Sequence, residues 1–361
     1  MSFDMDAAVV APFRMQPGLR RLAPGAAHLT PLPPGSRHQR EKLAVLSAFA
    51  HQALVCAPDF DPVPALHKVC EQATTEHPDA FAWDGQCAKS LTLGVAVEGE
   101  RIRESAAGVF GLGDEIGRCL RGLPPPWRLA GLLALAFAQD LAVVQGDNGM
   151  VSWMAVALPS HWDPAHKVGR HFNEIHAAVA DPQLLLAAGE RLMKLVCGSD
   201  SYERFVWNVT GHPRLHAHPD RVDPLRWPLG AQTPFDRQAW WRTERQTFLP
   251  LSGRGQAVFT IEVEVQPLGA ALSSARQAQA LHAAISTMSP AVLDYRGLTP
   301  VRDALLQWLE HERALSSARG PVQQPTQRSA SDPVQRAEPI FSTGQRSQDK
   351  GSGPGVEVRS A

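Results

Sequence analysis

Histidine is the residue type whose spacing in this chain could do chemistry, because its neutral ring nitrogen binds zinc and heme iron. Four of the fourteen histidines stand at equal steps of five in PSHWDPAHKVGRHFNEIHAAVA, residues 159–180: His161, His166, His171 and His176. On an α-helix each residue advances by about 100°, so steps of five turn successive side chains by about 140°. Such steps cannot bring four imidazoles to one face, which argues against one metal held by all four.

The surroundings of the histidines narrow the metal hypotheses further. Pro164 interrupts the segment and predicts a turn at His161, followed by a short helix from Lys167 to Glu174. A second group lies in GHPRLHAHP and consists of His212, His216 and His218. It has no H-E-x-x-H context, and its prolines indicate a loop. A zinc-binding protein that uses both groups is kept as one hypothesis, which predicts stoichiometric zinc and no heme.

The sequence lacks the common motifs for metal binding by cysteines, for nucleotide binding and for a serine nucleophile. The five cysteines are widely spaced, without the C-x-x-C pair of a zinc, iron–sulfur or dithiol motif, and we expect reduced, mostly buried thiols. GVFGLGDEIG has the wrong spacing for a dinucleotide-binding loop. Neither a P-loop nor a G-x-S-x-G nucleophile elbow occurs.

Composition bounds the class of protein. The 361 residues are 44% hydrophobic, and 35 Lys and Arg against 36 Asp and Glu leave no excess positive charge to drive phosphate binding. We therefore expect no nucleic-acid partner. MSFDMDAAVVAPFR lacks the basic region of a secretory signal, and the most apolar stretch, Leu129–Val144, is shorter than a membrane span. These features predict a cytoplasmic location and no membrane segment.

Hydrophobic spacing predicts helices around a strand-rich middle. Apolar residues at three- and four-residue steps predict helix in residues 40–76, 273–288 and 300–315, and the run from Pro126 to Asp140 is apolar enough for a buried helix. Alternation predicts strands in residues 90–104, 151–159, 204–211 and 256–268. In the last strand, Thr260, Glu262 and Glu264 fall on one face, which should meet solvent. This arrangement favours an α+β fold over an alternating doubly wound sheet.

We expect three regions along the chain. Residues 1–40 are Pro-rich but carry apolar side chains such as Phe13 and Met15, which suggests an extended segment packed on the core without regular structure. Residues 41–313 would form a single main domain. Residues 314–361 are rich in Ser, Gln, Pro and Gly, so burial cannot repay their ordering entropy, and they are predicted to be a disordered tail.

The segment AWWRTERQTFLPL, residues 239–251, concentrates tryptophan and charge just before a predicted strand. One interpretation is a solvated charged face with one buried tryptophan, because runs of charge usually face water. The other is functional: an arginine of this run would be aimed at a carboxylate, since guanidinium groups form bidentate pairs with carboxylates.

Six stretches match, in order, the motifs of one known family. APFRMQPGLRRL is similar to PF..GL..L, AQDLAVV to QEDL, LPSHWDPAHKVGRHFNEIHAAV to PS.W...K.G.....IHAPVP, RFVW to R.NW, RTERQTFLPL to R.ERQTL.RLP, and SPAVLDYRGL to SP....YKG. They cover roughly residues 11–300. Chance would rarely produce this order, and the set resembles the alpha (heme-binding) subunit family of heme-dependent oxidative N-demethylases.

The resemblance implies a fold and a reaction. The fold would be PAS-like, an antiparallel sheet with flanking helices that binds heme b, in agreement with the α+β prediction. The heme would use O₂ and electrons from a separate reductase with flavin (FMN) and iron–sulfur domains to oxidise a small methylated amine, such as dimethylamine, with release of formaldehyde. The chain has no cysteine cluster for an iron–sulfur centre, so electrons would come from another polypeptide.

The resemblance also implies site residues. His176 matches the histidine of IHAPVP and would be the axial iron ligand, whereas the other three histidines of the equally spaced series match no fixed histidine. Three cations would pair with heme propionates or fix the site: Lys167, Arg170 and Arg245. The implied catalytic residues are Asp140 and Arg204.

Three further residues would support this site. Trp207 would pack on the macrocycle or in the core, and Glu244 and Gln246 would hold other side chains in place.

Three positions depart from the family motifs. IHAPVP reads IHAAVA here, the asparagine of R.NW is Val206, and Gln139 replaces one acid of QEDL while Asp140 is retained. An acidic group near the iron would suit a cationic amine, because an unpaired buried charge is costly. The departures leave three alternatives open: a different amine substrate, heme binding without turnover, or loss of heme. A non-catalytic heme or small-ligand module, acting as a sensor or scaffold, is the competing hypothesis.

Overall fold

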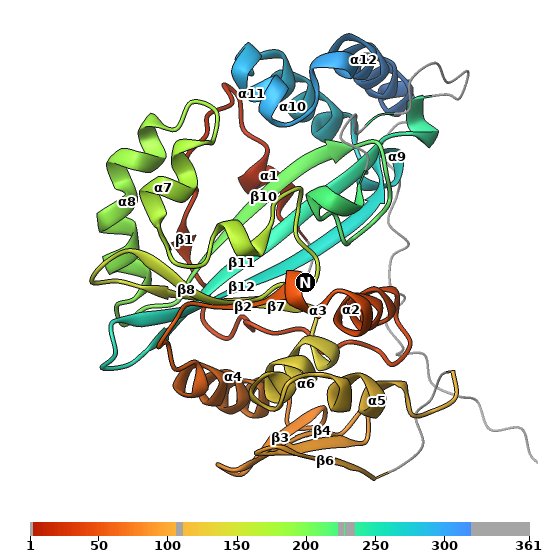
Figure 1. The fold of residues 1–361 in the computed structure, drawn as a ribbon. Coiled ribbons are helices and arrows are strands. Elements are labelled where there is room, and N and C mark those ends of the chain that lie inside the picture. The colour runs from red at the N-terminus through yellow and green to blue at the C-terminus, as the bar shows by residue number, and fades with distance from the viewer. Residues whose placement is uncertain (1–2, 106–110, 223–226, 228–234, 319–361) are drawn as a thin grey trace, which may run out of the picture. The chain divides into compact units, whose positions relative to one another are not determined.

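The computed structural model describes residues 3–105, 111–222, 227 and 235–318, and these residues form two antiparallel sheets with helices packed on them (Figure 1). The larger sheet has the strand order β1-β10-β11-β12-β7-β8-β2, with β9 paired to β8. Its strands are β1 (Arg20–Arg21), β2 (Leu54–Cys56), β7 (Gln139–Gln145), β8 (Met150–Ala155), β9 (Arg170–His171), β10 (Tyr202–Thr210), β11 (Trp240–Leu251) and β12 (Gln256–Pro267). The smaller sheet contains β3 (Phe81–Trp83), β4 (Cys87–Ser90), β5 (Val95–Glu98) and β6 (Arg101–Glu104). The mixture of helices and antiparallel sheets confirms the α+β prediction.

Helices cover both faces of the larger sheet (Figure 1). The smaller sheet and one group of helices lie on one side: α2 (Arg37–Ala48), α3 (Ala50–Ala53), α4 (Val63–Glu76), α5 (Glu115–Gly122) and α6 (Arg128–Ala136). The remaining helices are α1 (Met5–Ala8), α7 (Phe172–Ala177), α8 (Gln183–Val196), α9 (Leu268–Ala271), α10 (Ala275–Ser286), α11 (Pro290–Tyr295) and α12 (Arg302–Ala318). Of these, α7 and α8 pack on the face of β10 and β11 that carries Tyr202 and Phe248, whereas α1, α10 and α12 pack with Trp207 and Trp241 on the opposite face. No helix in these described ranges is long and apolar enough to cross a membrane.

The alternation of side chains along the central strands explains why the sheet is covered twice. On β7, Leu141 and Val143 belong to the apolar cluster that includes α4 and α6. Their neighbours Ala142 and Val144 belong to a different cluster, together with side chains of α8. Because successive residues of a strand point to opposite faces, a strand that is apolar at every position requires a cover on both sides.

Several predicted element boundaries are wrong, because pairing in the sheet overrides local apolar spacing. The predicted helix 40–76 is interrupted by β2, which pairs with β8. Residues 139–140, predicted as the end of a helix, begin β7. Residues 91–94, predicted as part of a strand, form the turn between β4 and β5.

The two predicted solvent-facing surfaces of the sheet are also largely buried. On β12, Thr260 and Glu262 are buried and only Glu264 is exposed, because the chain before α2 covers this strand: Thr30 Oγ1 donates a hydrogen bond of 3.1 Å to Glu262. The charged run of residues 239–251 is β11 itself, and its Arg242, Glu244, Arg245 and Gln246 are all buried. The interpretation of this run as a solvated face is therefore wrong.

The predicted regions can be located on the structure. Residues 1–40 contain α1 and β1 as well as irregular backbone, so the segment is not wholly without regular structure. The last helix, α12, continues to Ala318, beyond the boundary predicted at residue 313. The remainder of the predicted tail, residues 319–361, lies outside the described residues.

Candidate functional site

A cavity of about 340 Å³ is lined by side chains of the larger sheet, of α7 and α8 and of the end of α11, a size within the range of small-molecule sites. Its walls are largely apolar and include Phe172, Ile175, Leu185, Met193, Phe248 and Phe259. Its polar lining side chains are Ser160, His161, Lys167, His176, Arg204, Asn208, Arg242, Glu244, Gln246, Tyr295 and Arg296.

The register of β10 and β11 selects which charged side chains reach the cavity. Arg204 pairs with Gln246 and Val206 pairs with Glu244, and all four line the cavity. Directly paired residues share a face of the sheet, and residues between them point to the opposite face. Arg245, between Glu244 and Gln246, therefore lies on the other side of the sheet.

His176 lies at the C-terminal end of α7 with one ring nitrogen already engaged. Its Nδ1 donates a hydrogen bond of 2.7 Å to the carbonyl oxygen of Phe172, and its ring stacks on the Phe172 ring with the centroids 3.9 Å apart. A histidine that ligates a metal usually donates its other ring N–H to a carbonyl or carboxylate, which fixes the tautomer. This hydrogen bond leaves Nε2 as the nitrogen with a free lone pair.

The electrostatic surroundings keep His176 neutral. Burial, together with the positive charges of Arg204 and Lys167 and against the opposing effect of the Phe172 hydrogen bond, lowers its pKa to about 4. An imidazole can coordinate iron only in its neutral form. The ring is therefore in its ligating protonation state at neutral pH.

Four lining cations have no carboxylate within ion-pair distance among the residues that the structure describes. Arg242 is held by backbone carbonyls, and the other three are Lys167, Arg204 and Arg296. Burial lowers the pKa of all three, in the case of Arg296 to about 10. The Nε atoms of Arg204 and Arg296 are buried and lack a hydrogen-bond acceptor. Buried guanidinium groups are normally paired, so this arrangement is suited to an anionic ligand.

Glu244 is the single carboxylate among the described lining residues of the cavity. Ser160 donates a hydrogen bond to its Oε1, and Gln246 Nε2 donates one of 2.5 Å to its Oε2. Arg242 donates 2.7 Å to the Ser160 hydroxyl, and its other nitrogens donate to backbone carbonyls, including those of Leu158 and Leu215. Arg242 thus supports the loop that holds Ser160, and Ser160 holds the carboxylate.

Trp207 borders the cavity, and its ring packs on the face of β10 opposite to Arg204 and Val206. Its indole Nε1 donates 3.0 Å to the carbonyl of Ala8, and its ring stacks on Trp241 at 5.2 Å. The guanidinium of Arg296 lies 4.8 Å from the centroid of the Trp207 ring and 4.5 Å from that of Phe13. These cation–π contacts hold the Arg296 side chain in place.

Three of the sequence-predicted site residues are not among the residues that line the cavity. Asp140 is buried, with Oδ1 3.1 Å from Lys42 Nζ and Oδ2 accepting a hydrogen bond of 2.7 Å from the Leu158 amide. Arg170 is exposed on β9. Arg245 is paired with Glu203: its Nε donates a hydrogen bond of 3.1 Å to Glu203 Oε2, and its Nη2 lies 3.1 Å from the same oxygen. The cavity brings together six residues that the sequence predicts for the site: Lys167, His176, Arg204, Trp207, Glu244 and Gln246.

The equally spaced histidines have four different environments. His161 lines the cavity from a backbone with φ of 63°, and His166 is exposed beside Asp163. His171 caps α7, with its Nδ1 accepting from the Asn173 amide. The predicted helix from Lys167 to Glu174 is wrong in its start, because β9 occupies residues 170–171 and α7 begins at Phe172.

The loop histidines do not complete a metal site. No group of three or more His, Cys, Asp or Glu side chains is placed to hold a metal ion in the ranges that the structure describes. The rings of His216 and His218 stack at 6.1 Å, and His216 Nδ1 donates 2.7 Å to the carbonyl of Ala157. This geometry does not support the zinc hypothesis.

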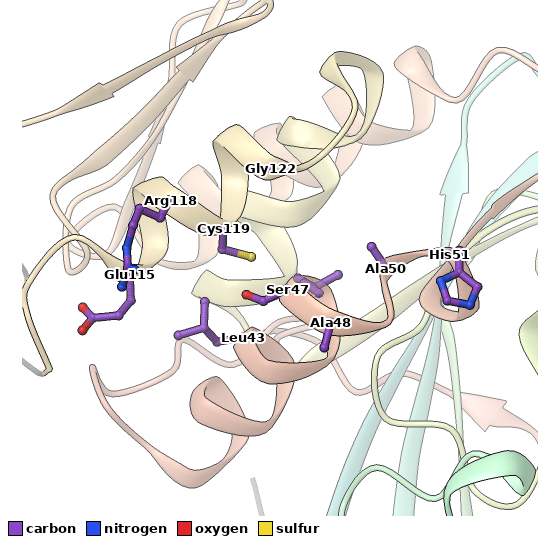
Figure 2. Close-up of a pocket in the computed structure, with 10 residues that line it drawn as sticks. Leu43, Ser47, Ala48, Ala50, His51, Glu115, Arg118, Cys119 and Gly122 are labelled. Carbon is purple, nitrogen blue, oxygen red and sulfur yellow. The ribbon is translucent and has the colours of Figure 1, made fainter.

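A second cavity, of about 510 Å³, lies between α2, α3 and α5 (Figure 2). Its charged groups are engaged locally: Glu115 accepts a hydrogen bond of 3.0 Å from the Gly113 amide, and Arg118 Nε lies 3.2 Å from Asp114. Burial raises the pKa of the Cys119 thiol, which disfavours a reactive thiolate. Among its described lining residues, Glu115 and Arg118 are therefore both engaged by neighbours.

Residues 37–306 match the family described as "Haem-dependent oxidative N-demethylase, alpha subunit-like". The chain belongs to this family. The description indicates dependence on heme and, for an alpha subunit, assembly with partner subunits. The matched region contains all the described strands of the larger sheet except β1, together with α7 and α8.

The cavity of this N-demethylase-like chain fits heme in three respects. Its walls are apolar, as a porphyrin requires, and His176 presents a neutral nitrogen that suits heme iron. The buried, unsatisfied Nε atoms of Arg204 and Arg296 suit the propionate carboxylates. The residues present therefore match the group that the family requires.

Sequence reasoning missed part of this site. Arg296 is not among the site residues that the sequence predicts. It follows Tyr295 in SPAVLDYRGL and occupies the position of the lysine in the family motif SP....YKG, so a cation at this position could have identified it. The resemblance implies only a supporting role for Glu244, whereas its side chain lines the cavity. Nothing in the sequence indicated that Phe172 accepts the hydrogen bond of His176, because that contact depends on α7.

Proposed function

We propose that this chain is the heme-binding subunit of an oxygenase that removes a methyl group from an amine. The observation that supports it most strongly is His176, whose Nδ1 is held by the Phe172 carbonyl and whose Nε2 is left for iron in a cavity with unpaired cations. The proposal includes a PAS-like fold and heme of the b type, in which no covalent bond joins the porphyrin to the protein.

Each wall of the cavity has a proposed task. His176 would hold the iron, and Lys167 and Arg296 would pair with the propionates. Trp207, Phe172 and the other apolar lining residues would contact the porphyrin and exclude water. Glu244 would accept the ammonium group of the substrate, because a carboxylate held by Ser160 and Gln246 is already oriented. The bound heme would supply O₂ binding and electron transfer.

The proposed reaction balances as R₂N–CH₃ + O₂ + 2 e⁻ + 2 H⁺ → R₂NH + HCHO + H₂O. One oxygen atom enters the methyl carbon, the C–N bond breaks to release formaldehyde, and the second oxygen atom leaves as water. The two electrons would come from partner subunits, which we propose to carry FMN and an iron–sulfur cluster. The membership in an alpha-subunit family supports such partners.

The function is tested by product analysis of the heme-reconstituted protein. An artificial electron donor and a panel of methylated amines are supplied, and O₂ uptake and formaldehyde are measured together. The proposal predicts equal amounts of O₂ consumed and formaldehyde released with at least one amine, and neither without heme. O₂ uptake without formaldehyde for every amine would contradict the proposal and favour the heme-binding module without catalysis.

A further inference from the structure

The cavity holds more positive charge than heme requires. The described lining residues include four cations, Lys167, Arg204, Arg242 and Arg296, against one carboxylate, Glu244. Arg242 is saturated by the Ser160 hydroxyl and by backbone carbonyls, and it supports Glu244 through Ser160. Three cations remain, whereas a heme has two propionates. One cation is therefore left for a second anionic group.

The position of Arg204 distinguishes it from the other two cations. Arg204 and Gln246 are directly paired across β10 and β11, and Gln246 donates to Glu244, so Arg204 and Glu244 are diagonal neighbours on one face. Glu244 is the charged group that opposes the effect of burial on the pKa of Arg204. Yet no ion pair within 4.0 Å joins them in the described structure, and the Arg204 Nε is unsatisfied.

We propose that the substrate is an N-methylated amine that also carries a carboxylate, bound as a zwitterion by Arg204 and Glu244. Diagonal neighbours on a sheet have Cβ atoms about 7–8 Å apart, and long side chains span that gap. A carboxylate and an ammonium separated by one carbon atom fit between the two. The inference rests on the proposed function, because it assigns Lys167 and Arg296 to the heme.

Val206 supports this assignment. It is the direct partner of Glu244 across the two strands and follows Arg204 on the same face, so it lies next to both charged groups. Its apolar side chain offers a contact for N-methyl groups and no hydrogen bond that would compete for the ammonium. The face of four residues therefore presents a cation, an anion and an apolar surface side by side.

A plain methylamine satisfies only half of this arrangement. It would neutralise Glu244 and leave the Arg204 guanidinium buried without an anion, and a site built for a polar group rejects ligands that lack it. Hydrogen bonds to charged groups contribute about 1.5–3 kcal/mol, equivalent to about ten- to a hundredfold in affinity. The substrate class is therefore decided by the carboxylate as much as by the amine.

The test is calorimetric binding to the heme-loaded protein without an electron donor, with N-methylglycine and dimethylamine as probes. The wild type should bind N-methylglycine at least about tenfold more tightly than dimethylamine. Arg204→Gln should remove this preference while the heme absorbance spectrum is retained, and Arg204→Lys should keep part of it. Arg191→Gln, an exposed arginine on α8, is the control and should bind both probes as the wild type does.

Each other outcome overturns the proposal. Equal affinities in the wild type, or no binding of N-methylglycine, would exclude zwitterion recognition. A preference that survives in Arg204→Gln would remove Arg204 from it, and loss of heme from that variant would assign Arg204 to a propionate instead. Failure of the oxygenase function is separate: it would appear as tight binding of N-methylglycine with no formaldehyde once electrons are supplied.

Discussion

At the scale of single residues, the environment of His176 has two parts that act together. The carbonyl of Phe172 fixes the tautomer, and burial with two nearby cations keeps the ring unprotonated. Neither part depends on the prolines that the family motif has after this histidine and that this chain lacks. The alanines at those positions therefore leave the features that suit His176 to iron in place.

The cations around the cavity make different predictions for heme affinity. Arg296 lies against the cavity, whereas Arg170 is exposed on β9 and outside the lining. Arg296→Gln should weaken heme binding by about tenfold or more, because it removes a charge-assisted hydrogen bond to a carboxylate. Arg170→Gln should change the affinity by less than about twofold. Heme titration followed by absorbance measures both, and the opposite order would mean that β9 holds the propionates.

Sequence alone could identify some of these residues but not their orientation. His176, Lys167, Arg204 and Trp207 were found through motifs, and all four line the cavity. Arg245 and Glu244 stand in the same motif, yet only Glu244 faces the cavity, because adjacent residues of a strand point to opposite faces. Which set of alternate residues in a strand faces the cavity depends on the helices and loops that cover the sheet, and these lie far away in the sequence.

At the scale of elements, the buried pair of Lys42 on α2 and Asp140 on β7 connects the helical layer to the sheet. Both side chains are at most 1% exposed, and Asp140 also accepts a hydrogen bond from Leu158, just after β8. Asp140 therefore stabilises the strands that flank the cavity, in a place where the resemblance had implied a catalytic role.

Substitution of Asp140 separates these two roles. Asp140→Asn should lower the free energy of unfolding by about 3–5 kcal/mol, because it leaves Lys42 as a buried charge without a partner. At temperatures where the variant is folded, its heme spectrum should match that of the wild type. Asp200→Asn is the control: it breaks an exposed pair with Arg21 and should cost about 1 kcal/mol or less. An altered heme spectrum with unchanged stability would support the catalytic role.

His28 lies where the N-terminal segment contacts the larger sheet, and its titration makes the stability of the protein depend on pH. Its ring bonds Thr247 at 2.9 Å and Ser201 at 3.1 Å, and burial, opposed by the nearby Glu76, lowers its pKa. The unfolded chain therefore binds more protons than the folded chain below about pH 6.5, and stability falls as the pH drops through this range.

The contribution of His28 is measurable by urea unfolding at pH 7.5 and 5.5. The wild type should lose more stability between these values than His28→Gln, in which nothing at this position titrates. The exposed His51 provides the control, and His51→Gln should lose as much as the wild type. An identical loss in the wild type and in His28→Gln would show that His28 is not the group responsible.

At the scale of the whole molecule, the cavity exists because the larger sheet is covered on both faces. Alternation in residues 204–211 and 256–268 was enough to predict antiparallel strands and the α+β class. The burial of Thr260 and Glu262 was not predictable, because Thr30 and the chain around it reach them from more than two hundred residues away. The local sequence pattern therefore predicts the strands. The burial of their side chains depends on packing against segments that are distant in the sequence.

The most direct test of the central claim is the absorbance spectrum of the protein titrated with heme. The wild type should develop a Soret band that saturates at one heme per chain, and His176→Ala should abolish or shift that band. His166→Ala, which removes the exposed histidine beside Asp163, should give the wild-type spectrum. An unchanged Soret band in His176→Ala would contradict the account, because it would place the iron ligand elsewhere.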